Sequence, residues 1–345
     1  MEAVFFNEHG GIDKIKVGQV DIPQVKSNEV LIKTKYAGLN HLDLFALNGV
    51  PGLTLSMPHI MGSDGSGIIK EVGNEVSIVN QGDRVLINPG ISCGKCFHCL
   101  AGKQNLCPDF VIKGEHIEGT FAEFFTVPEI NVVKIPKDFS FSDAAATPLN
   151  FLTAWRMVKS RANVQPNEYV FIHGAGGGVS SAAIQIAKSL GATVIATTST
   201  EEKMVKAREI GADYVFNYLK DTDYSKTTYK EITGKKGVDV VIDSVGQATF
   251  QTSMRLLKPN GRLVTCGATT GPNVSIDIRR IFWNQLNIIG STMSNQREFR
   301  EVIELVFAGK LSPIIDKVFP LEKAAEAEKY LQEGKQFGKV LLKNS

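Results

Sequence analysis

The pattern of hydrophobic and polar positions changes at about residue 166. Before that point the chain carries short alternating runs such as EVLIKTKYAGL, GIIKEVG and GDRVLINPG, each bounded by Gly, Pro or Asn. Alternation with a period of two predicts β-strands that bury one face, and the bounding residues are typical of turns. The first 140 or so residues are therefore predicted to be mainly β-structure.

Beyond residue 166 the pattern becomes strand, glycine turn, helix and strand, in NEYVFIH, GAGGGVS, SAAIQIAKSLGA and TVIAT. Apolar residues of this helix recur at spacings of three and four, and Gly191 is expected to end it. The alternation continues through EEKMVKAREIGA, DYVFNY, VDVVID, FQTSMRLLK and GRLVTCG, which predicts an α/β fold with a doubly wound parallel sheet. The final segment, with helices in EFREVIELVFAGK and AAEAEKYLQEG and a strand in GKVLLK, is expected to pack on the N-terminal domain.

Composition narrows the class of protein. The 345 residues are 43% hydrophobic and 21% charged, which is typical of a globular chain that forms two domains. The net charge is only +2 and the lysines are dispersed, so we expect small-molecule substrates and no nucleic-acid or membrane partner. No signal peptide is visible at the N-terminus and no apolar run approaches the roughly 18 residues of a membrane span, which favours a cytoplasmic location.

Four of the five cysteines lie in one short segment, CGKCFHCLAGKQNLCP. Their spacing is C-x2-C-x2-C-x7-C, at Cys93, Cys96, Cys99 and Cys107. In a reducing cytosol such a cluster predicts metal ligands, and four thiolates with no open position predict one structural zinc per chain. An iron–sulfur cluster is the alternative, because C-x2-C-x2-C also opens the bacterial ferredoxin pattern, although that pattern closes with C-x3-C-P.

The turn HGAGGGVSS lies between the first strand and first helix of the parallel sheet. Its backbone N–H groups and the positive helix N-terminus suit a dinucleotide pyrophosphate. We predict cofactor contacts at Gly174, Gly177, Gly178 and Val179, with Ser180 where a third glycine would aid close packing. A tight turn without a ligand is the alternative.

The next strand ends in IATTSTEEK, with Thr198 where an NAD site usually carries an acid for the ribose 2′-hydroxyl. A 2′-phosphate would meet no repulsion there, and Ser199, Lys203 and Tyr218 could bind it. The sequence therefore favours NADPH, against the alternative of a solvated loop that caps the following helix.

Together, GLNHLD, PHIMGSDGSGIIKEVG, the four-cysteine segment and HGAGGGVS resemble the medium-chain dehydrogenase/reductase superfamily from end to end. The resemblance implies a GroES-like β-barrel catalytic domain at 1–147 and 292–345 and a Rossmann domain at 148–291, with the active site between them. It also implies that the cysteines form a structural zinc lobe at about 90–110 that takes no part in the chemistry.

The zinc alcohol dehydrogenases of that superfamily carry a second, catalytic zinc. Its three ligands correspond here to Asn40, Ser63 and Leu149, which make a poor zinc site, and Leu42 replaces the hydroxyl that relays an alcohol's proton. Asn40, Asp43, the L-T-A-W stretch and the glycine turn resemble instead the quinone oxidoreductase branch, whose members use NADPH without a catalytic metal.

The loss of the metal favours conjugated acceptors. Hydride transfer to a quinone or an α,β-unsaturated carbonyl compound leaves a delocalised anion that hydrogen bonds can stabilise. We predict that Asn40 donates to the substrate carbonyl and that Asp64 orients Asn40 or a water. Glu115 and His116 are candidates to carry a proton. His41 matches a position that, by the resemblance, can contact the cofactor pyrophosphate.

Two other functions stay open. The first is a zinc alcohol dehydrogenase that recruits His41, Asp64 or His116 as unusual ligands. The second is a cofactor-binding structural or redox-sensing protein without turnover. In any of these cases, QLNIIGSTM resembles the superfamily's edge strand that pairs across a two-fold axis, so a homodimer or homotetramer is expected.

Overall fold

The computed structural model describes residues 1–344, and the chain divides into two compact units. The split unit contains residues 1–149 and the chain from residue 294 onward, and the central unit contains residues 150–293. The chain passes from one unit to the other after residue 149 and again after residue 293, in each case two residues later than the predicted domain boundary.

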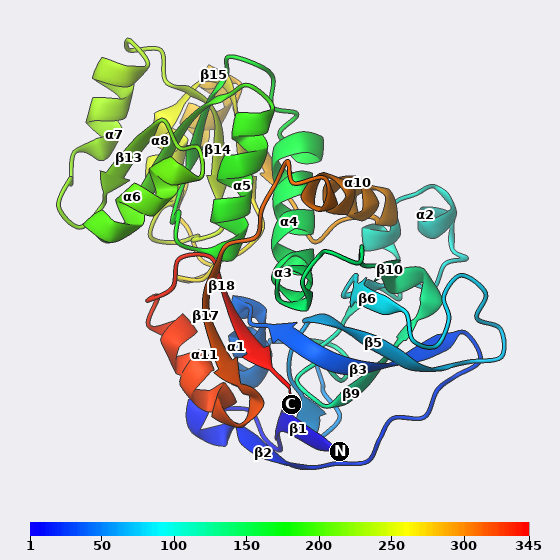
Figure 1. Ribbon diagram of the computed structural model, residues 1–345. Coiled ribbons are helices and arrows are strands. Elements are labelled where there is room, and N and C mark those ends of the chain that lie inside the picture. The colour runs from blue at the N-terminus through cyan, green and yellow to red at the C-terminus, as the bar shows by residue number, and fades with distance from the viewer. Residues whose placement is uncertain (345) are drawn as a thin grey trace. The chain divides into compact units, whose positions relative to one another are not determined.

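The central unit contains a six-stranded parallel sheet in the order β13-β12-β11-β14-β15-β16 (Figure 1). This order reverses direction between β11 and β14, which confirms the doubly wound sheet. Its strands are β11 (Tyr169–Ile172), β12 (Thr193–Thr198), β13 (Tyr214–Asn217), β14 (Val238–Asp243), β15 (Leu257–Thr265) and β16 (Asn287–Gly290).

Helices connect these strands, and the two that the sequence places after β11 and β12 form as expected. The first, α5 (Gly178–Ser189), buries its apolar stripe and is followed by Gly191 at φ +82°, a left-handed conformation that favours glycine. The second, α6 (Glu201–Glu209), begins after Thr200, whose hydroxyl accepts from the Lys203 N–H. The other helical segments here are α4 (Pro148–Trp155), Arg156–Arg161, α7 (Tyr224–Thr227), Thr228–Ile232, α8 (Phe250–Leu256) and α9 (Ile278–Asn284).

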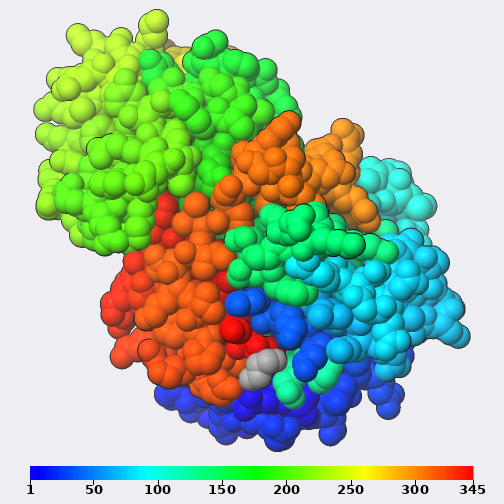
Figure 2. All heavy atoms as spheres, in the orientation of Figure 1, coloured from blue at the N-terminus to red at the C-terminus, as the bar shows by residue number. Residues whose placement is uncertain are grey.

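The split unit joins both ends of the chain in one seven-stranded sheet. Strand β18 (Lys339–Lys343) pairs antiparallel with β3 (Glu29–Gly38), bringing Leu341 opposite Gly38. Figure 1 shows the red strand β18 beside the blue strand β3. The final segment therefore packs on the N-terminal strands, as the sequence predicts, and Figure 2 shows its orange and red atoms against blue ones on the visible face of this unit.

The remaining elements of the split unit include helices inside the segment predicted to be mainly β-structure. One of them, the helix that follows Asn40, has an Asn40–Asp43 capping box, and the helix just beyond that segment begins after Ser140, whose hydroxyl accepts from the Asp143 N–H. The strands are β1 (Glu2–Phe6), β2 (Lys16–Gln19), β4 (His59–Ile60), β5 (Asp64–Val72), β6 (Arg84–Ile87), β7 (Gly90–Ile91), β8 (Val111–Ile112), β9 (Phe124–Pro128), β10 (Val132–Lys134) and β17 (Ile315–Pro320). The helices are α1 (His41–Asn48), α2 (Phe97–Leu100), α3 (Phe141–Ala146), α10 (Gln296–Phe307) and α11 (Ala324–Gln332), with single turns at Ile12–Lys14, Gln104–Leu106, Glu129–Asn131 and Leu321–Lys323.

Among residues 1–344, no helix is both long enough and apolar enough to cross a membrane.

Candidate functional site

Of the predicted catalytic residues, Asn40 contacts the carboxylate of Asp64, which begins β5 and is fully buried, whereas His116 does not. Asp64 Oδ1 accepts from the Leu149 N–H at 2.8 Å. Its Oδ2 accepts from Asn40 Nδ2 at 3.0 Å and from Lys339 Nζ at 2.7 Å. A buried carboxylate needs such donors, because an unpaired charge in an apolar interior is very costly. Asp64 is thus tied to the start of α1, to Leu149 and to β18.

Lys339 is the residue of this cluster that the sequence interpretation missed. Its side chain is only 3% exposed, and its ammonium donates to Leu39 O at 2.7 Å, Asn40 Oδ1 at 2.8 Å and Asp64 Oδ2. These three acceptors use all three ammonium hydrogens. The one sequence signal was a lysine at the start of GKVLLK, a strand whose next three residues are buried.

Asn40 precedes α1, and its own N–H donates to Asp43 Oδ2 at 2.7 Å, which fixes the first turn of the helix. Its side-chain amide donates to Gly38 O at 3.2 Å and to Asp64. Both amide hydrogens are therefore already engaged in this structure. The role of Asn40 as a donor to a substrate carbonyl stays a prediction that requires one of these bonds to be exchanged.

The three positions that correspond to lost zinc ligands do not fit a metal. Asn40 directs its oxygen to Lys339, Ser63 Oγ donates to Lys113 O at 2.7 Å, and Leu149 contributes only its backbone N–H to the cluster. Within residues 1–344, the four cysteines are the only group of three or more His, Cys, Asp or Glu side chains close enough to hold a metal ion. His41, Asp64 and His116 therefore do not come together as an alternative zinc site.

Glu115 and His116 form a contact that suits proton transfer. Glu115 Oε2 lies 3.3 Å from His116 Nδ1, which also accepts from the Ile112 N–H at 3.3 Å. Burial raises the pKa of Glu115 to about 7, and burial lowers the pKa of His116. Near neutral pH, Glu115 can therefore gain or lose a proton beside a neutral His116. His41, at the start of α1, also has a lowered pKa, first because of burial and then because of the charge of Lys339.

The four cysteines form a compact cluster around α2. Cys93 Sγ lies 4.0 Å from Cys99 Sγ and 3.5 Å from Cys107 Sγ, while Cys96 and Cys99 are 3.5 Å apart. Zinc–sulfur bonds of about 2.3 Å in a tetrahedron place the sulfurs about 3.8 Å apart, so the cluster fits zinc. The backbone N–H groups of Lys95 and Cys96 lower the pKa of Cys93 to about 7, which favours the thiolate form that binds metal.

The glycine turn of the central unit has the backbone that a pyrophosphate site requires. Gly174 has φ +65°, a left-handed conformation, and a Cβ on Gly178 would lie 2.5 Å from the Asn150 amide. The first N–H groups of α5, including that of Val179, have no partner within the helix. In place of a third glycine, Ser180 is buried and its hydroxyl donates to His173 O at 2.8 Å.

The residues proposed for the 2′-phosphate lie at the carboxyl ends of β12 and β13. The Tyr218 N–H donates to Thr198 O at 3.0 Å, which joins the two strand ends. Ser199 follows Thr198 directly, and Lys203 lies in the first turn of α6. Their contact with a cofactor stays a prediction.

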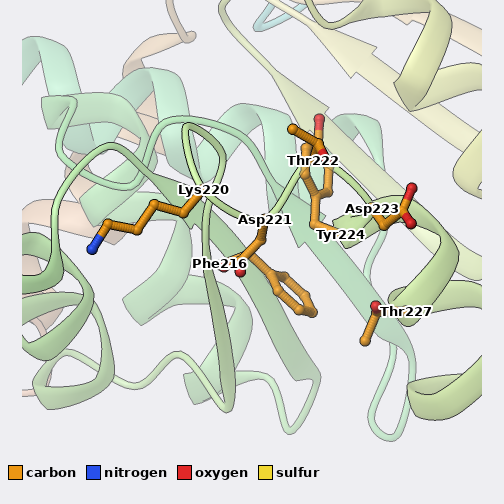
Figure 3. A pocket seen from close by; sticks show the side chains of 7 residues that line it. All are labelled: Phe216, Lys220, Asp221, Thr222, Asp223, Tyr224 and Thr227. Carbon is orange, nitrogen blue, oxygen red and sulfur yellow. The ribbon is translucent and has the colours of Figure 1, made fainter.

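A hollow of about 460 Å³ opens just beyond Tyr218. Figure 3 shows its lining, which includes no residue of the glycine turn. The lining residues are Phe216, Lys220, Asp221, Thr222, Asp223, Tyr224 and Thr227.

Comparisons with known proteins place this geometry in a family. The alcohol dehydrogenase GroES-like domain matches residues 26–137, and the zinc-binding dehydrogenase domain matches residues 178–308. An NAD-dependent alcohol dehydrogenase of Sulfolobus acidocaldarius is 32% identical over 99% of both chains. The quinone oxidoreductase of Homo sapiens is 30% identical over 99% of this chain and 97% of its own. A crystal structure of an NAD-dependent alcohol dehydrogenase has a TM-score of 0.95 at 43% identity, covering 99% of each chain.

The fold and the site thus define an oxidoreductase of the nicotinamide-dependent class. The chain belongs to the medium-chain dehydrogenase/reductase superfamily, which confirms the family and the GroES-like plus Rossmann fold inferred from its motifs.

The raised pKa of Glu115 predicts a pH-dependent stability. Between the ordinary pKa of 4.5 and about 7, the folded state holds a proton that the unfolded state loses, so this residue's contribution falls as the pH rises through that window. Glu115→Gln removes this dependence. We expect the melting temperature of the variant, relative to the wild type, to rise between pH 5 and pH 8.

The matched control is Glu118→Gln, because Glu118 is exposed on the same loop. Its melting temperature relative to the wild type should be the same at both pH values. If the difference in melting temperature between Glu115→Gln and the wild type is also the same at pH 5 and pH 8, then Glu115 is ionised in the folded protein throughout this range.

Proposed function

We propose that the protein is an NADPH-dependent reductase that transfers a hydride to a quinone or an α,β-unsaturated carbonyl compound without a catalytic metal. The observation that carries this proposal is the pairing of Asp64 with Lys339 and Asn40. Lys339 also donates to Asn40 Oδ1, so the oxygen of Asn40, at one of the three positions where the resemblance places metal ligands, is already engaged. The two curated relatives named for each chemistry are 32% and 30% identical to this chain, whereas the solved structure at 43% identity is of an NAD-dependent alcohol dehydrogenase, so overall similarity does not favour the quinone reductase.

The chemistry of the acceptor follows from the donors available. The nicotinamide supplies the hydride when it is bound. Reduction of a simple ketone leaves a localised alkoxide, which needs a metal or an equally strong electrophile. Reduction at the β-carbon of an enone, or of a quinone, spreads the charge over a conjugated system, so neutral hydrogen-bond donors suffice. A chain without a fitting catalytic metal site is therefore suited to conjugated acceptors.

The proton that completes the reduction is assigned to the Glu115–His116 pair. The pKa of Glu115 is raised to about 7 by burial, so its carboxyl group can take up and release a proton near neutral pH, and its Oε2 lies 3.3 Å from His116 Nδ1. The His116 side chain is 32% exposed, which allows exchange with solvent. The pair can thus hold a proton at a defined atom and replace it from water.

The choice of NADPH rests on the carboxyl ends of β12 and β13. Thr198 stands in place of an acid, so a 2′-phosphate meets no negative charge from that position. Ser199, Lys203 and Tyr218 supply hydroxyl donors and a positive charge. Several relatives are named NAD-dependent alcohol dehydrogenases, so this chain would differ from them in cofactor as well as in acceptor.

The sharpest test of the function combines metal content with a panel of acceptors. We expect one zinc per chain, held by the four cysteines, and NADPH oxidation with quinones, enals or enoyl thioesters that continues in a chelator. Primary alcohols should be oxidised poorly. Two zinc ions per chain, with activity that chelation abolishes and zinc restores while the fold stays intact, would establish the alcohol dehydrogenase alternative instead.

Cys96→Ser tests whether the zinc held by the four cysteines contributes to stability and not to catalysis. Loss of one thiolate should lower zinc content and melting temperature, since a closed four-thiolate site contributes folding free energy. Cys266→Ser is the control, because Cys266 lies outside the cluster, and it should leave zinc content unchanged.

Lys203→Ala tests the cofactor assignment. One charge-assisted hydrogen bond to a phosphate contributes roughly 1.5–3 kcal/mol, so the Kd for NADPH should rise roughly 10- to 100-fold. The Kd for NADH should change little, as measured by fluorescence titration. Lys206→Ala, one turn further along α6, is the control. Equal losses for NADPH and NADH would remove the 2′-phosphate assignment.

We also propose a homodimer or homotetramer formed through β16. This strand lies at the edge of the central sheet, so one of its sides has no partner strand within the described sheet. Large apolar side chains are exposed beside it, with Ile278 at 70%, Phe282 at 61% and Trp283 at 82% exposure on α9. An apolar edge of this kind favours pairing with a second copy across a two-fold axis.

Trp283→Glu should therefore weaken association, which sedimentation velocity at micromolar concentration would show as a smaller species. Tyr214→Glu is the matched control, because Tyr214 is an exposed aromatic residue on β13, at the opposite edge of the same sheet. The proposal is wrong if the wild type sediments as a monomer, or if both variants dissociate equally.

A further inference from the structure

The ammonium of Lys339 lies in a cage made only of oxygen atoms. Leu39 contributes a backbone carbonyl, Asn40 an amide oxygen and Asp64 a carboxylate oxygen, all at 2.7 or 2.8 Å from Nζ. The cage has one formal negative charge and is closed to solvent, since Asn40 is 5% and Asp64 0% exposed. Carbonyl and carboxylate oxygens are the ligands that hard cations prefer. These three oxygens thus form a cation site that the Lys339 ammonium occupies.

Removal of the ammonium would leave these oxygens facing one another without a donor between them. The remaining contacts of Asp64 come from Leu149 N–H and Asn40 Nδ2, both of them neutral. The amide of Asn40 is held in one orientation because its oxygen accepts from Lys339 while its nitrogen donates to Asp64. Without the cation, nothing in this set would neutralise the carboxylate, and the amide would be held only by its N–H bonds to Gly38 O and Asp64.

Two further buried acids lie near enough to the same lysine to interact with its charge. Glu328, on α11, is fully buried, and neither of its carboxyl oxygens has a hydrogen-bond partner among the described residues. Oδ1 of Asp43 is also buried without a partner in that part of the chain. Burial and the neighbouring acid raise the pKa of Glu328 well above its ordinary value, and Lys339 opposes that rise. One ammonium thus lies near three buried carboxyl groups, and burial favours the neutral form of Glu328 and Asp43.

We propose that Lys339 is the resident cation of this site, that its ammonium positions Asn40 and Asp64, and that the site will bind a small primary ammonium ion once the lysine side chain is removed. The class of ligand follows from the cage, which requires a positive charge with three N–H donors. The positioning role rests on the proposed function, whereas the binding of an ammonium ion does not.

Lys339→Ala with added n-propylammonium tests the proposal, because propylammonium reproduces the removed atoms from Cγ to Nζ. Breaking a buried ion pair by removing one partner should lower the melting temperature by roughly 6–20 °C. Propylammonium should restore much of this loss with saturating dependence on concentration. It should not stabilise the wild type, or Lys343→Ala, whose lysine is exposed at the end of the same strand.

Two other probes separate charge from size and from donor geometry. n-Propanol fills the same space without a charge, and tetramethylammonium carries the charge without an N–H donor, so neither should raise the melting temperature of Lys339→Ala. The proposal is overturned if propylammonium gives no stabilisation, or if n-propanol or tetramethylammonium is as effective.

A double variant keeps the test decisive if Lys339→Ala does not fold. Asp64→Asn with Lys339→Met removes both charges, so it should be clearly more stable than Lys339→Met alone, which leaves the carboxylate unpaired. Additive or larger destabilisation in the double variant would contradict the resident-cation assignment.

Kinetics then test positioning separately from folding. Saturating propylammonium should raise the kcat of Lys339→Ala with a conjugated acceptor and leave KM for NADPH nearly unchanged. If stability is restored and kcat is not, Lys339 is a structural residue only and its positioning role is wrong. If the wild type reduces no conjugated acceptor, the proposed function fails, while the melting temperatures still decide whether the site binds ammonium.

Discussion

A fully buried carboxylate imposes the strongest constraint on the split unit. Asp64 has no contact with solvent, so its charge must be matched within the protein. The three donors that match it come from segments far apart in sequence, at Asn40, Leu149 and Lys339. Satisfying Asp64 therefore fixes where α1 begins, where the chain leaves the N-terminal strands and where β18 joins β3.

The buried Asp64 cluster and the four-cysteine cluster are independent of each other. The four-cysteine cluster obtains all its ligands from one short loop, so it needs nothing from the Asp64 cluster. The Asp64 cluster, by contrast, has its oxygen atoms committed to an internal ammonium. A member of this superfamily can thus retain a zinc-binding loop while the chemistry of its catalytic positions changes, and the presence of the loop does not identify the reaction.

The sequence predicted best what depends on local pattern. The strands β11 to β15 and the helices α5, α6 and α8 follow from periodicity, whereas the helical segments within 224–232 were not predicted; the glycine turn and the four cysteines follow from spacing. It could not show that both amide hydrogens of Asn40 are engaged, or that Lys339 neutralises Asp64. Those facts depend on side-chain contacts between residues up to 299 positions apart, for which a single sequence contains no signal. The short helix α1 was also missed, because its start is defined by the Asn40–Asp43 contact.

The late position of β18 has a consequence for biosynthesis. Asp64 and Lys339 are separated by 275 residues, which a ribosome adding about 5–20 residues per second needs roughly 15–55 s to synthesise. During that interval the Tyr36–Gly38 end of β3, beyond the part that pairs with β9, has no strand on the side that later receives β18, and Asp64 lacks its counter-charge. The central unit, whose 144 residues are contiguous between 150 and 293, can meanwhile complete its own sheet. The nascent chain therefore passes through a state in which the central unit can be complete while a short part of β3 is unpaired and Asp64 is uncompensated, a state in which protection by chaperones would matter most.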